Sequence, residues 1–143
     1  MIDRTSESEL LDSVKARLPD LKTLLEKSSS HWGYEDPIYR FYHHSFKVFA
    51  LQSQTEKIVS ALQQLLPSHS LNTWFLQIVG EGTGKEFSPD MNAGWEHHTR
   101  PILEAFFHAR FFLEMAVRYA DLPSPPDQLP SGWAALLYLY GLR

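Results

Sequence analysis

Histidines are clustered in this 143-residue chain: five of the seven fall in two places. His43 and His44 are adjacent, and His97, His98 and His108 follow later in the chain. Imidazole nitrogens bind divalent metals and act as general acids or bases near neutral pH. The clustering therefore indicates a metal-binding or acid–base site as one function open to this chain.

Glu104 and His108 are the most specific pair within these clusters. They are four residues apart, which places both side chains on one face of a helix. Arg110, Glu114 and Arg118 mark a solvated face of that helix by their four-residue spacing, so the opposite side is predicted to be the core. That side carries Ala105, Phe112, Ala116 and Tyr119, with His108 near its centre and Glu104 nearer its border. Phe107, Phe111, Phe112 and Met115 would then partly desolvate the pair, as in many catalytic or metal sites. The favoured interpretation is structural, a buried histidine whose hydrogen bond to the glutamate satisfies both groups.

A metal site would need a third protein ligand besides Glu104 and His108. Four more side chains are of a suitable kind: His43, His44, Glu96 and His97. Arg100 and Tyr42 complete the candidate site as possible helpers in a reaction. The spacing matches neither Glu-x-x-His nor His-Glu-x-x-His, so a divalent metal is the less favoured interpretation and the sequence requires no cofactor.

Two other catalytic motifs are absent or incomplete. The stretch Gly80-Glu81-Gly82-Thr83-Gly84-Lys85 resembles a phosphate-binding loop, but Lys85 is followed by Glu86 instead of Ser or Thr, and the preceding segment is predicted to be a helix. We interpret it as a helix stop followed by a flexible loop. The chain also lacks the Gly-x-Ser-x-Gly elbow of serine hydrolases.

Composition narrows the possible compartments and partners. Cysteine is absent, which excludes disulfides and thiolate sites, and no leader or apolar run of about 20 residues is visible, so we expect a cytoplasmic protein without a membrane span. The net charge is −4, with 13 basic residues scattered among 17 acidic ones. Duplex binding needs a concentrated positive face, so nucleic acid is disfavoured as a partner.

Residues typical of helix starts and ends divide the first half of the chain into predicted helices. Ser6 and Glu9 form a capping box for a helical run that Pro19 either divides or bends and that ends at Ser28-Ser29-Ser30. Asp36-Pro37 predicts the next start. A second capping box, Ser53-x-x-Glu56, predicts a break near residues 51–53, and Pro67 closes this region.

Further signals divide the second half. Ser70 or Asn72 opens a fourth helix, which Gly80 ends, and a long polar loop follows to Gly94. The fifth helix ends near Ala120 and begins either at Thr99 or earlier, at Asn92, with a kink at Pro101.

The C-terminal region ends in an unusually apolar helix. Leu122 to Pro130 is proline-rich and predicted to be extended, and Ser131 is expected to cap a helix from Gly132 to about Tyr140. That helix is apolar on nearly every side, so it should lie at the centre of the fold or against a second subunit.

The sequence thus predicts an all-α fold: residues 1–143 form a single-domain irregular bundle of five to six helices with a buried apolar C-terminal helix. The function it favours is a non-catalytic interaction or small-ligand-binding protein that forms a homo-oligomer or binds a protein partner. The alternative is a metal-binding protein or metal-dependent enzyme with a His/Glu cluster between the second and fifth helices.

Overall fold

The computed structural model describes the backbone of residues 4–28, 37–83, 95–121 and 132–142, and the side chains of residues 5–28, 51–83, 100–121 and 132–142. This part of the chain contains helices and no strand, which confirms the all-α bundle. Its six helices are α1 (Arg4–Ala16), α2 (Leu18–Ser28), α3 (Pro37–Leu65), α4 (Thr73–Thr83), α5 (Trp95–Ala120) and α6 (Trp133–Leu139).

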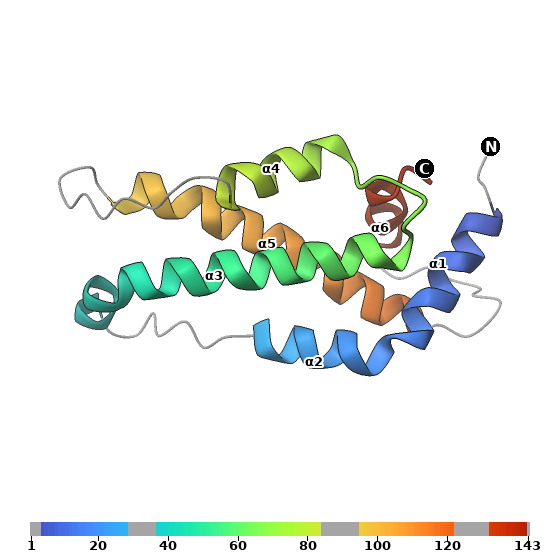
Figure 1. Ribbon diagram of the computed structural model, residues 1–143, viewed down its shortest axis with the longest axis horizontal. Helices are drawn as coiled ribbons and strands as arrows, with labels where there is room; N and C mark the ends of the chain where they lie inside the picture. The colour runs from blue at the N-terminus through green and yellow to red at the C-terminus, as the bar shows by residue number, and fades with distance from the viewer. Residues whose placement is uncertain (1–3, 29–36, 84–94, 122–131, 143) are drawn as a thin grey trace.

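Helix α5 is the centre of the bundle, because each of the other five helices packs against it. In Figure 1, α3 crosses in front of α5, with α4 along one edge of the molecule and α2 along the other. The buried stripe of α5 includes Ala105, Ala109 and Leu113, all fully buried, spaced four residues apart. The two alanines allow neighbouring helices to approach closely, while the larger side chains around them supply most of the buried apolar area.

The first helical run is divided into two helices, one of the two arrangements that the sequence allows. The division falls at Arg17, and Pro19 lies in the first turn of α2, where its missing N–H would have no partner in the helix. The predicted cap at Ser6 is wrong, since α1 begins at Arg4. Ser6 lies inside α1 and is buried, with its Oγ 3.5 Å from Nε2 of His69.

Helix α3 begins at Pro37 and ends before Pro67, as the sequence predicts. The expected break near residues 51–53 is wrong, because the helix is continuous there. Leu51 and Thr55 are buried there, and the Thr55 hydroxyl donates to the Leu51 carbonyl at 2.7 Å. Ser53 and Glu56 lie on the exposed side of a continuous helix. Burial of the opposite face outweighs a capping box that would contribute only about 1 kcal/mol.

Helix α4 begins after Asn72, whose Oδ1 accepts a hydrogen bond from the Trp74 amide at 2.8 Å, so Asn72 is the cap. The expected stop at Gly80 is wrong, because α4 continues through Gly80 and Gly82 to Thr83. The rest of the predicted loop, 84–94, lies outside the described residues. Gly82 faces α5, and close packing between the two helices explains a glycine at this helical position.

Of the two predicted starts of helix α5, the structure agrees with the earlier one. The helix begins at Trp95 and continues through Thr99 and Pro101, so Thr99 is not its cap. The predicted start at Asn92 lies outside the described residues. The helix ends at Ala120, as the sequence predicts.

Helix α6 buries one side in the fold, while Ala134 and Tyr138 are exposed on the other side, so it is not buried all round as its apolar sequence suggests. Trp133 and three leucines of α6 are buried. The Trp133 ring lies edge-on to the Tyr119 ring of α5, with the two ring centroids 3.9 Å apart.

The N-cap of α6 is Gly132, with a φ of 93° in the left-handed region that favours glycine. The cap was expected at Ser131, so that prediction is wrong by one residue, and the segment 122–130 lies outside the described residues. Burial in the fold accounts for Trp133 and the leucines of α6, and the expected contact with a second subunit stays a prediction.

Candidate functional site

The seven residues of the predicted site lie on two helices that pack together. Helix α3 carries Tyr42, His43 and His44, and α5 carries the other four: His97, Arg100, Glu104 and His108. The side chains at positions 42–44 and 97 lie outside the described part of the chain. Their convergence with Glu104 and His108 therefore stays a prediction.

Glu104 and His108 are not the buried side-chain pair that the sequence suggests. Nδ1 of His108 lies 2.7 Å from the backbone carbonyl oxygen of Glu104. A carbonyl oxygen can only accept, so this nitrogen carries the proton. The Glu104 carboxylate is 3.5 Å from Nε of Arg100, and these two side chains are 55% and 82% exposed. The expectation of a desolvated glutamate–histidine pair is thus wrong.

The cause of this error is the position of two phenylalanines. Phe107 and Phe111 are 53% and 41% exposed, so they lie on the solvent side of α5 and do not cover Glu104 and His108 with apolar surface. The buried stripe of α5 is centred on Ala105 and Ala109 instead, rotated away from Glu104. Arg118 and Glu104 belong to the same exposed side as the two rings.

Exposed aromatic side chains of α4 and α5 form a surface beside Glu104. Trp74 on α4 is 51% exposed, and its ring meets the His108 ring edge-on, with centroids 5.3 Å apart and planes at 76°. We call Trp74, Phe107, His108 and Phe111 the aromatic surface. The sequence carried a signal for it, since Phe107 and Phe111 follow Arg100 and Glu104 at alternating spacings of three and four residues.

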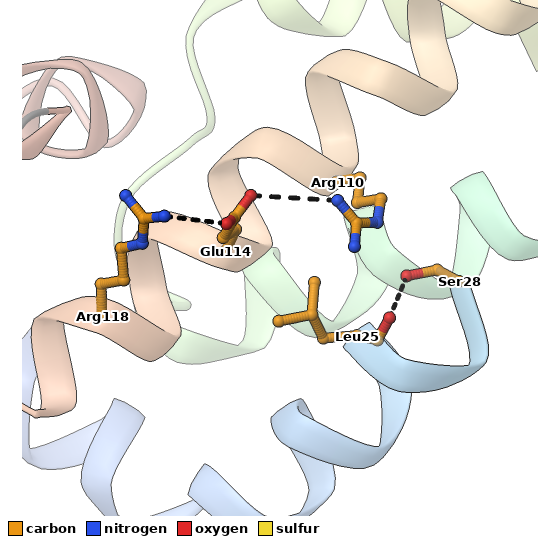
Figure 2. A network of polar contacts seen from close by, with 5 residues as sticks. All are labelled: Leu25, Ser28, Arg110, Glu114 and Arg118. Carbon is orange, nitrogen blue, oxygen red and sulfur yellow. Dashed lines mark hydrogen bonds and ion pairs between the residues drawn. The ribbon is translucent and has the colours of Figure 1, made fainter. Parts of the chain in front are cut away.

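A row of charges continues along α5 beyond the aromatic surface (Figure 2). Arg118 Nη2 donates to Glu114 Oε1 at 3.1 Å, and Arg110 Nη1 lies 3.9 Å from Glu114 Oε2. Figure 2 shows the Arg110 guanidinium near the end of α2, where the Ser28 hydroxyl donates to the Leu25 carbonyl at 2.9 Å. These contacts confirm the charged side of α5 that four-residue spacing indicates, and they are structural ion pairs between partly exposed groups.

Two buried tyrosines have strongly shifted pKa values, and both have structural roles. Burial raises the pKa of Tyr140, whose hydroxyl donates to the Leu62 carbonyl at 2.8 Å. Burial, together with the negative charges of Glu7 and Asp12, raises the pKa of Tyr119, whose hydroxyl donates to the Glu7 carbonyl at 3.0 Å. Both hydroxyls stay protonated near neutral pH and join distant segments of the chain.

The described residues support neither a metal centre nor a converged ligand site. Among their side chains, no group of three or more His, Asp or Glu residues is arranged to hold a metal ion. A hollow along α3 takes its lining from one face of that helix: Ser53, Glu56, Lys57, Ser60, Ala61 and Gln64. The metal-binding alternative depends on side chains outside the described residues and stays a prediction, which elemental analysis of untagged protein would test.

Comparison with protein-family models, with curated protein sequences and with solved structures finds no match for this chain. In the described part of the chain, no helix combines the length and the apolar character that crossing a membrane requires.

Proposed function

We propose that this protein is a non-catalytic helical interaction protein that self-associates through its aromatic surface. The observation that carries the proposal is the half-exposure of three large rings, Trp74, Phe107 and Phe111, on two helices that pack together. Large aromatic side chains are enriched at protein interfaces, where they bury much apolar area and lose little conformational entropy. A protein partner is therefore the kind of ligand that this surface fits.

The surrounding chemistry supports binding in preference to catalysis. His108 contacts a backbone carbonyl and an exposed tryptophan, and Glu104 is paired with Arg100 on the exposed side of α5. A general acid or base must lie within hydrogen-bond reach of a bound substrate. The described contacts of Glu104 and His108 instead resemble those of side chains at the rim of an interface. A cytoplasmic location, expected from the absence of cysteine, is part of the proposal.

Light scattering coupled to size exclusion tests the proposal. At micromolar concentrations we expect a mass near twice 16.5 kDa, rising with concentration from the monomer value. A matched pair of variants tests the surface: Phe111→Ser and Leu76→Ser, since both side chains are 41% exposed. Leu76 follows Trp74 by two residues, which places it about 200° around α4 from the aromatic surface.

The expected result is that Phe111→Ser shifts the protein toward the monomer and Leu76→Ser does not. A monomer at all concentrations for the unchanged protein would contradict self-association. Equal effects of the two substitutions would contradict the assignment of the surface.

A further inference from the structure

We draw no further inference here: the strongest candidate, the aromatic surface that Trp74, Phe107, His108 and Phe111 form on α4 and α5, carries nothing beyond the proposed function, because nothing in the described part of the chain shows what covers it.

Discussion

Gly82 on α4 lies so close to Ala105 on α5 that a Cβ added to Gly82 would be 2.5 Å from the Ala105 Cβ. The same atom would be 2.7 Å from the carbonyl oxygen of Pro101. Backbone atoms cannot rotate out of the way, so the helices could accept a side chain at this position only by moving apart. A glycine ordinarily weakens a helix, but here it allows α4 to approach α5 closely.

The substitution Gly82→Ala is therefore expected to destabilise the protein. Alanine gains up to about 1 kcal/mol of helix propensity over glycine, but overpacking at a rigid contact costs about 1–3 kcal/mol. Because overpacking costs more than helix propensity gains, we expect a lower free energy of unfolding. Urea denaturation followed by circular dichroism would measure it.

Gly80→Ala is the matched control for that prediction. Gly80 lies in the same helix, and a Cβ added there meets no atom within 4 Å. Only the gain in helix propensity remains, so this variant should be as stable as the unchanged protein or up to about 1 kcal/mol more stable. If both alanine variants gained stability alike, the close packing of α4 on α5 at Gly82 would be wrong.

Tyr140→Phe is expected to cost about 1–2 kcal/mol of unfolding free energy, because it removes a buried hydrogen bond. The Tyr140 side chain is buried, and its hydroxyl donates to the Leu62 carbonyl of α3. Tyr138→Phe is the control, since the Tyr138 side chain is exposed and its loss of a hydroxyl should change stability by less than about 0.5 kcal/mol. Equal urea midpoints for the two variants would contradict the role of the Tyr140 hydroxyl.

Local signals predicted the helix boundaries where nothing in the tertiary structure opposed them. Pro37 begins α3, and Asn72 caps α4 through its own side chain. Ser6 and Ser53 carry equally good capping patterns, yet both lie inside helices. In these two cases burial of a helix face outweighs a cap, and the sequence of a single segment contains no information about what packs against it.

The candidate site was harder to predict than the helix boundaries. A rotation of a few tens of degrees about the α5 axis decides whether a side chain on that helix is buried or exposed. Phe107 and Phe111 are large and apolar, so assigning them to the core is the natural first interpretation, and it moves Glu104 and His108 inward with them. The structure confirms the predicted core positions Ala105, Phe112, Ala116 and Tyr119, but it leaves Phe107 and Phe111 partly exposed outside them. Small residues give a weak hydrophobic signal, although they mark the places where helices come closest.

Glu114→Gln is expected to lower the unfolding free energy by less than about 1 kcal/mol. Glu114 contacts Arg110 and Arg118, each four residues away, and partly exposed pairs of this kind are worth about 0.3–0.5 kcal/mol. Glu104→Gln loses only the contact with Arg100 and should cost less. Both losses should shrink in about 1 M salt, where exposed charges are screened. A cost above about 2 kcal/mol for Glu114→Gln would show that this network contributes more than exposed pairs do.

Alkaline pH is expected to unfold the protein through its buried tyrosines. Burial raises the pKa of Tyr140 above the ordinary value of 10.0, so the folded state holds the proton more tightly than the unfolded chain. Below about pH 10 both states keep the proton, and this difference has no effect on stability. Above about pH 10 the unfolded chain releases the proton and the folded protein does not, so each further pH unit lowers the unfolding free energy by about 1.4 kcal/mol for this one group.

Tyr140→Phe isolates that contribution. The variant starts from a lower stability at about pH 8, but between about pH 10 and 12 its unfolding free energy should fall less steeply than that of the unchanged protein, since phenylalanine has no proton to release. Tyr119 keeps part of the slope in both proteins, because burial and the charges of Glu7 and Asp12 raise its pKa as well. Urea midpoints measured at successive pH values would give the two slopes. Parallel slopes would contradict the prediction. They would mean that the Tyr140 hydroxyl ionises as readily in the folded protein as in the unfolded chain, despite its burial and its hydrogen bond to the Leu62 carbonyl.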